Sequence, residues 1–194
     1  MNPSQHQSLD QLFADLLQQQ NDSSSTLPSV HLWHPQKTGD MDMRIDREGR
    51  WIHEGGEIKR QRLVKLFSRI LRLEGEHYFL LTPLEKWQIS VDVAPFFITS
   101  ATREIRGDEQ AIVLNTSTDD DLVVGEQHPL WVNIEEDQET PIPLVTVRDN
   151  LSGLLSRAVY YQLVDWGHEV VREDGGKDLY IRSMGSEYKL GTLD

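Results

Sequence analysis

Residues Arg60 to Leu71 read R-Q-R-L-V-K-L-F-S-R-I-L, and 88 residues later Arg148 to Val159 read R-D-N-L-S-G-L-L-S-R-A-V. Five aligned pairs are identical, and three more are apolar in both copies. The matches fall at helical spacing, so both stretches are predicted to form the same amphipathic helix. The pattern predicts a duplicated unit, and the identical pairs are Arg60/Arg148, Leu63/Leu151, Leu66/Leu154, Ser68/Ser156 and Arg69/Arg157.

The residues around the first copy predict a unit in the order strand–strand–helix–strand–strand, over residues 28–92. Alternation of apolar and polar residues indicates strands on both sides of the helix. The alternation places Arg44 on the polar side of its strand with Asp42, and His53 on the same side as Trp51. The four predicted strands cover residues 41–46, 50–54, 77–82 and 86–92.

The second unit, residues 93–194, is predicted to repeat this order with three extra strands in front. Its helix is predicted to run from Arg148 to about Trp166, where Gly167 ends it. The fold class is therefore α+β, strand-rich and antiparallel, with two related units that each carry one helix. The predicted strands cover residues 95–103, 110–116, 122–124, 128–134, 142–147, 178–184 and 187–190.

Residues 1–27 are predicted to form a separate N-terminal segment. Apolar residues from Leu9 to Leu17 recur at i, i+3, i+4, i+7 and i+8, which indicates a short helix. The polar run N-D-S-S-S-T at 21–26 then acts as a linker. A mobile arm, a docking element for a partner and a strap across the domain are all compatible with this pattern.

The composition is that of an ordinary globular protein, with 38% hydrophobic and 26% charged residues. No apolar run approaches the ~20 residues that a membrane helix needs, and the first residues lack the pattern of a secretory signal. The chain has no cysteine, which excludes disulfides and thiolate metal sites. We expect a cytoplasmic protein without membrane contact.

The net charge of −13 is placed unevenly along the chain. Residues 1–107 carry 13 basic and 14 acidic side chains, a net charge of −1. Residues 108–194 carry 6 basic and 18 acidic side chains, a net charge of −12. An acidic half repels phosphate backbones, so nucleic acid is not expected as the main partner. A single nucleotide in a local basic pocket stays compatible with this balance.

The first predicted hairpin carries a mixed set of side chains that suits a polar ligand with an aromatic part. Within it, His53 beside a carboxylate could act in acid–base chemistry. The alternative interpretation is a hairpin with cross-strand ion pairs and a half-buried tryptophan. The set consists of Asp40, Asp42, Arg44, Trp51, His53 and Glu54.

Two further groups are candidates for binding. Arg60 and Arg148 stand where a strand is predicted to pass into a helix, where an arginine can satisfy carbonyls or bind a carboxylate or phosphate. Glu85 and Lys86 follow a predicted turn and form either an exposed pair or a pair with a fixed role. A basic stripe of Arg62, Lys65, Arg69 and Arg72 could receive an anion, an acidic partner or this chain's own acidic half, or be a solvated face.

Known catalytic and metal-binding patterns are absent from the sequence. His31 and His34 have no second pair at ligand spacing, and there is no H-E-x-x-H, nucleophile elbow or phosphate loop. No metal or cofactor is therefore identified, and a non-enzymatic role is favoured.

A further set of motifs runs through the chain: H-L-W-H-P and G-D-M-D-M-R-I within 31–45, W-I-H-E-G at 51–55, L-V-K-L-F-S-R-I-L at 63–71, T-P-L-E-K at 82–86, H-P-L at 128–130 and V-R-D-N-L at 147–151. With these motifs the chain resembles an uncharacterised bacterial family, the domain of unknown function 1285. The likeness covers about Pro28 to Gly191. It implies a two-part fold with an internal repeat, whose C-terminal part is superficially similar to pleckstrin-homology-like barrels. It also implies a nucleotide-like ligand at the interface between the parts and a role in signalling.

We therefore expect a non-enzymatic module that binds a small anionic or nucleotide-like ligand between two units. Arg44, Arg60 and Arg148 would supply charge, and Trp33 or Trp51 a stacking face. The alternatives are a protein-interaction adaptor that docks its partner through the N-terminal helix or an open sheet edge, and a hydrolase-type enzyme that uses His53. The remaining ligand-binding candidates are Asp42, His53, Glu85 and Lys86.

Overall fold

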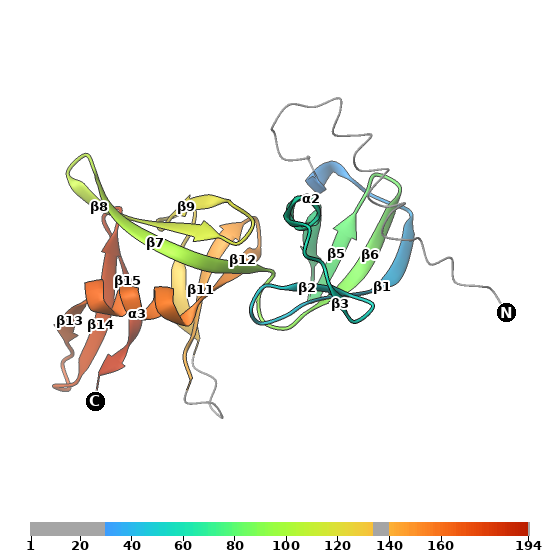
Figure 1. Cartoon of the computed structure of the whole chain (residues 1–194). Coiled ribbons are helices and arrows are strands. Elements are labelled where there is room, and N and C mark those ends of the chain that lie inside the picture. The colour runs from blue at the N-terminus through green and yellow to red at the C-terminus, as the bar shows by residue number, and fades with distance from the viewer. Residues whose placement is uncertain (1–29, 134–139, 194) are drawn as a thin grey trace. The chain divides into compact units, whose positions relative to one another are not determined.

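The computed structural model describes residues 30–133 and 140–193, which form two compact units (Figure 1). The first unit contains the described residues up to Asp46 together with Arg50–Val91. The second contains the turn Arg47–Gly49 and the described residues from Asp92 onward. The predicted helix over Leu9–Leu17 and the acidic run 135–139 lie outside the described residues.

The first unit is built on a six-stranded sheet in the order β3-β2-β1-β6-β5-β4. Neighbouring strands are antiparallel except β1 and β6, which are parallel. A short 3-10 helix, η1 (Val30–Leu32), precedes the sheet, and helix α2 (Gln61–Arg69) connects β3 to β4. The strands are β1 (Lys37–Ile45), β2 (Trp51–His53), β3 (Gly56–Glu57), β4 (Leu71–Glu74), β5 (His77–Leu81) and β6 (Glu85–Val91).

The core of the first unit lies between helix α2 and strands β1 and β2. Met43 and Ile45 alternate inward from β1 and are almost completely buried. Trp51 stacks on Phe67 of α2, with ring centroids 6.0 Å apart. The apolar face predicted for this helix is therefore the face that packs, and it buries Leu63, Val64, Leu66 and Phe67.

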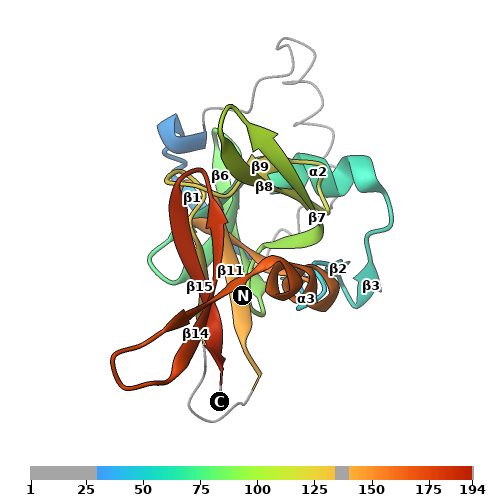
Figure 2. The same ribbon diagram turned by 90° about the vertical axis from the view of Figure 1, so that its left-hand side faces the viewer.

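The second unit contains another six-stranded sheet, in the order β10-β11-β12-β7-β8-β9. Its neighbouring strands are antiparallel except β7 and β12, which are parallel. Helix α3 (Arg157–Trp166) follows β12 and packs against β7 (Figure 2). The strands are β7 (Phe96–Arg106), β8 (Glu109–Thr116), β9 (Asp121–Val123), β10 (Leu130–Asn133), β11 (Ile142–Arg148) and β12 (Leu151–Leu155).

A three-stranded sheet, β13-β14-β15, completes the second unit. Strand β14 packs against β8 and also contacts α3. Ser183 at the end of β14 is completely buried. Its hydroxyl accepts a hydrogen bond from the N–H of Ile112 (2.9 Å) and donates one to the carbonyl of Val124 (2.7 Å), which ties the two sheets together. The strands are β13 (His168–Val171), β14 (Lys177–Ser183) and β15 (Ser186–Leu193).

The prediction that Arg148–Val159 forms a second copy of the first helix is wrong. Leu151–Leu155 form strand β12, and α3 begins only at Arg157. Strand β12 lies in the middle of its sheet and is buried on both faces, so its apolar run also fits helical spacing. The paired serines differ as well, because Ser156 caps α3 whereas Ser68 lies inside α2.

A repeat is nevertheless present in the order of the strands. When the six strands of each sheet are numbered in chain order, the first sheet, read from β3, has the order third-second-first-sixth-fifth-fourth. The second sheet, read from its β9 edge, has the same order. The helix follows the third strand in the first unit and the sixth strand in the second. The strand-rich α+β class is confirmed, while the wholly antiparallel arrangement is corrected to one parallel pair in each six-stranded sheet.

Most predicted strands are present within a few residues, but four were missed, β12 among them. β3 and β13 are short edge strands, and β4 lies where the sequence predicts the end of the first helix. The predicted end of the second helix, at Trp166 with Gly167 as its cap, is confirmed. In the described part of the chain, no helix is long and apolar enough to cross a membrane.

Replacing Ser183 with alanine should lower the free energy of unfolding by about 1–3 kcal/mol, because a buried N–H and a buried carbonyl then lose their partner. Urea denaturation would measure this loss. Ser186→Ala at the start of β15 is the matched control, since the hydroxyl of Ser186 makes no hydrogen bond within the described residues. Equal unfolding midpoints for the two variants would contradict the bridging role of Ser183.

Candidate functional site

The pleat of the β1–β2 hairpin separates the candidate residues into two groups. Met43 pairs with His53, and Arg44 pairs with Ile52. Paired residues of antiparallel strands share a face, so His53 lies on the face of Trp51 while Arg44 lies on the other with Asp42. This division agrees with the alternation in the sequence. The hairpin alone does not bring the four side chains to one site.

The two candidate tryptophans both pack in the first unit. Trp51 is only 2% exposed and stacks on Phe67, so its burial favours the structural interpretation of this ring. Trp33 is half-buried and packs against the apolar cluster of Val30, Phe79 and Leu81. Of the two residues, Trp33 is the more exposed.

His53 is held by the backbone of the neighbouring strand. Its Nδ1 lies 2.8 Å from the carbonyl oxygen of Asp42. A carbonyl only accepts, so Nδ1 carries the proton, and Nε2 of the neutral ring is left as an acceptor. The carboxylate of Glu54 is 4.0 Å from Nε2 and largely exposed. The contact with the Asp42 carbonyl thus fixes the orientation of the imidazole ring.

Arg60 and Arg148 do not occupy equivalent positions. Arg60 is the exposed N-cap residue of α2, and its carbonyl accepts hydrogen bonds from the N–H groups of Leu63 and Val64. Arg148 ends β11 and is followed by a turn into β12, so the predicted strand-to-helix junction at this residue is wrong. The Arg148 guanidinium lies over the ring of Phe96, 5.3 Å from its centroid.

Glu85 and Lys86 have fixed structural roles at the start of β6. The hydroxyl of Thr82 accepts the N–H of Glu85 at 3.0 Å, and the Glu85 carboxylate pairs with Lys37 at 3.2 Å. Lys86 pairs with Glu74 at 2.5 Å and lies over the ring of Phe79. These contacts give the side chains of Glu85 and Lys86 a structural role.

Arg72 and Glu74 link Trp33 to Lys86. Arg72 pairs with Glu74 and also donates hydrogen bonds to the carbonyls of Trp33 (2.9 Å) and Val30 (3.3 Å). The pKa of Glu74 lies below its ordinary value, chiefly because Lys86 donates a hydrogen bond to the carboxylate. Burial opposes this shift, and the pairing with Arg72 adds to it. Arg72 belongs to β4, so it stands apart from the basic stripe predicted on the helix.

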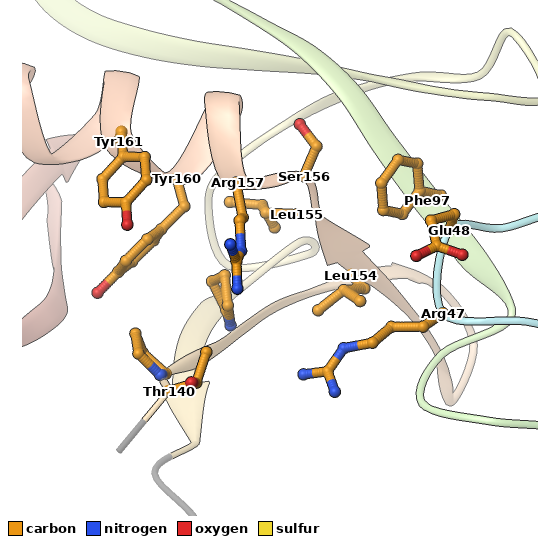
Figure 3. A pocket seen from close by; sticks show the side chains of 12 residues that line it. Arg47, Glu48, Phe97, Thr140, Leu154, Leu155, Ser156, Arg157, Tyr160 and Tyr161 are labelled. Atoms are coloured by element: carbon orange, nitrogen blue, oxygen red, sulfur yellow. The ribbon is translucent and has the colours of Figure 1, made fainter. Parts of the chain in front are cut away.

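A cavity of about 640 Å³ lies in the second unit, where the sequence predicted no site (Figure 3). Its walls come from β7, from β11 and β12, from the first turns of α3, and from the turn Arg47–Gly49. They combine apolar, aromatic, hydroxyl and charged groups. The lining residues are Arg47, Glu48, Phe97, Thr140, Pro141, Pro143, Leu154, Leu155, Ser156, Arg157, Tyr160 and Tyr161.

Local contacts fix the walls of this cavity. Gly49 has a φ of +74°, and a Cβ there would lie 2.4 Å from Cβ of Phe97, so only glycine lets the turn lie this close to β7. The Tyr160 hydroxyl donates a hydrogen bond to the carbonyl of Leu190 at 2.8 Å. Burial, and then the neighbouring Tyr161, raise the pKa of Tyr160, so it stays protonated at neutral pH. Tyr161 is 62% exposed and stands at the rim.

Arg47 and Arg157 differ from the other cations of the second unit. Seven lysines and arginines there have an acidic or aromatic partner. Arg47 and Arg157 have none among the described residues, and both line the cavity. Their side chains extend toward its middle in Figure 3. Two cations without partners in an acidic unit indicate a site for an anion.

Sequence reasoning missed this cavity because its residues come from separate stretches. Arg47 falls between two predicted strands, and Arg157 lies within the helix predicted from Arg148 to about Trp166. One signal was available in the sequence. Cations are scarce in the acidic half, so each of them has several carboxylates available as ion-pair partners, and a cation without such a partner is unusual. No group of three or more His, Asp or Glu side chains in the described ranges is placed to hold a metal ion.

Comparison with known proteins gives family matches over most of the chain. Residues 28–94 match the model of the N-terminal domain of DUF1285, a domain of unknown function, and residues 95–190 match that of the C-terminal domain. The resemblance inferred from sequence motifs is thereby confirmed. No curated protein matches this chain.

Two solved structures are similar to this chain, and both are DUF1285 family proteins. The protein from Silicibacter pomeroyi DSS-3 is 37% identical, with 92% of this chain and 95% of that chain covered and a TM-score of 0.78. The protein from Shewanella baltica OS155 is 26% identical, with 64% of this chain and 91% of that chain covered and a TM-score of 0.50.

Glu74 should stabilise the fold only while it is ionised. Because its pKa is lower in the folded state, its contribution is present above the unfolded value of about 4.3 and is lost as the pH falls through the folded value. Glu74→Gln should therefore lose up to about 1 kcal/mol at neutral pH, since the carboxylate is partly solvated. The difference from wild type should shrink as the pH falls below about 4.

Urea denaturation across this pH range would measure the difference. Glu76→Gln is the matched control, because Glu76 is exposed in the adjoining turn and has no ion pair within the described residues. A difference between Glu74→Gln and wild type that stays constant with pH would show that the ionised network contributes nothing to stability.

Proposed function

The chain belongs to the DUF1285 family, whose function is unknown, and we propose that it is a small-ligand-binding module whose site is the cavity of the second unit. The observation that carries this proposal is the cavity itself. Its volume of about 640 Å³ lies in the range of about 300–1,000 Å³ that ligand pockets span. Its apolar walls with a few convergent polar groups are typical of such pockets.

The cavity suits an organic molecule that has both an apolar part and a negative charge. Pro143, Leu154 and Phe97 offer apolar surface to the body of such a ligand. The hydroxyl groups of Thr140 and Tyr161 can form hydrogen bonds with it. Arg47 and Arg157 supply positive charge without having to give up a partner among the described residues. This chemistry supports the anionic ligand expected from the sequence.

Several finer expectations from the sequence stay predictions. They are a nucleotide-like ligand, a site between the units, a role in signalling and a cytoplasmic location. The likeness of the second unit to pleckstrin-homology-like barrels is also a proposal. Its support is a strand-rich unit in which a helix follows the last strand of the six-stranded sheet.

The alternatives have less support from the described residues. The adaptor hypothesis depends on the N-terminal helix, which lies outside the described residues, or on an open sheet edge such as that of β13, which by itself identifies no partner. The enzyme hypothesis depends on His53, which belongs to the first unit and does not line the cavity. We therefore place the proposed function at the cavity.

Thermal shift assays with a panel of small organic anions, nucleotides included, should find compounds that raise the melting temperature. A ligand at 100 times its dissociation constant stabilises the folded state by about 2.7 kcal/mol, which shifts the melting temperature by several degrees. Tyr161→Ala should weaken this shift, because it removes a ring from the rim without opening the core.

Ile105→Ala is the matched control, since Ile105 is also largely exposed, on β7, but does not line the cavity. This variant should respond to the compounds as wild type does. If no compound of the panel raises the melting temperature at millimolar concentration, the proposed function loses its support. A compound that acts equally on wild type and Tyr161→Ala would place the site elsewhere.

A further inference from the structure

The pairing of charges in the second unit points to the class of anion that the cavity takes. The six cations after residue 107 share that half of the chain with 18 acidic side chains, so an arginine there has an abundance of carboxylates. Arg172 and Lys189 both pair with Asp178, and Arg182 pairs with Glu187. Against this background, Arg47 and Arg157 have neither an acidic nor an aromatic partner in the described residues, which is a specific feature of the cavity.

The two arginines reach the cavity from different elements. Arg157 is the first residue of α3, and the cap formed by Ser156 and the N–H of Val159 fixes its position. Arg47 lies in the turn that Gly49 holds against Phe97. Each arginine is held in place by a different stretch of backbone, so the two lie on different walls of the cavity. A ligand that pairs with both therefore joins two separate walls.

One carboxylate, that of Glu48, lines the cavity within the described residues. In Figure 3 it lies beside Phe97, whereas the Arg47 guanidinium extends away from Phe97 toward Thr140. The end of the cavity near Thr140 and Arg157 is thus the positive one. The end near Phe97 and Leu154 combines apolar side chains with the Glu48 carboxylate, so it suits the uncharged body of the ligand and not its negative group.

A carboxylate and a phosphate differ in how they satisfy two guanidinium groups. A carboxylate has one charge and two oxygens, which match the fork of a single arginine. A phosphate monoester carries a charge of about −1.5 to −2 and three acceptor oxygens, enough for two arginines at once. The carboxylate would leave one cation of the cavity uncompensated.

We infer that the cavity of the second unit binds a small organic phosphate monoester, with the phosphate between Arg47 and Arg157 and an apolar or aromatic body toward Phe97 and Leu154. The inference rests on the proposed function and narrows its ligand to one chemical class. The body distinguishes such a ligand from inorganic phosphate, and the phosphate distinguishes it from an organic carboxylate.

Titration calorimetry with phenyl phosphate, benzoate and inorganic phosphate would test this class. Phenyl phosphate should bind at least tenfold more tightly than either of the other two. Arg47→Gln and Arg157→Gln should each weaken the binding of phenyl phosphate at least tenfold. Arg106→Gln is the matched control and should leave binding unchanged, because Arg106 pairs with Glu104 outside the cavity. Circular dichroism would check that each variant is folded.

The outcomes separate the class of ligand from the proposed function. If benzoate binds as tightly as phenyl phosphate, the phosphate inference is overturned while the ligand-binding function stands. If inorganic phosphate binds as tightly as phenyl phosphate, the organic body contributes nothing and the inference is also overturned. If phenyl phosphate fails to bind while another compound of the wider panel stabilises the protein through Tyr161, only the inference fails. If nothing in the panel binds, both fail.

Discussion

The parallel pairing of the first and sixth strands is the constraint on which both units depend. Each six-stranded sheet consists of two three-stranded meanders, and this pairing is what joins them. In both sheets a glycine faces an aromatic residue across the junction, Gly39 opposite Trp87 and Gly153 opposite Phe96. A Cβ on Gly39 would lie 2.5 Å from the ring of Trp87, so only a residue without a side chain fits at this position of the junction.

The same pairing builds the cavity of the second unit. Because β12 lies beside β7, Leu154 is opposite Phe97, and both reach the cavity. The N–H of Ser156 donates to the carbonyl of Ile98 at 3.0 Å, so the chain leaves the sheet at a defined point. Helix α3 then begins at Arg157 and carries Tyr160 and Tyr161 to the same place. A strand pairing thus sets the position of the charged and aromatic groups.

Sequence reasoning succeeded where the pattern had one interpretation and failed where it had two. The helix at Leu63–Phe67 keeps its apolar face on one side, and its prediction is confirmed. The aligned run Leu151–Leu155 fits the same spacing, but it is a central strand with both faces covered. Among the candidate site residues, Lys86 and Trp33 do come together, through Arg72 and Glu74. The combination of Arg47 with Arg157 was not predicted, because the two residues lie 110 positions apart in the chain.

The amino-acid sequence alone determined the family, the strand-rich α+β class, the first helix and the acidic character of the second half. These properties depend on local periodicity, on motifs and on composition, all of which one reading of the chain contains. Only the tertiary structure decided the parallel junctions, the strand at 151–155 and the cavity with its two arginines. These features depend on which distant segments share a sheet, and a pattern of neighbouring residues does not specify that choice.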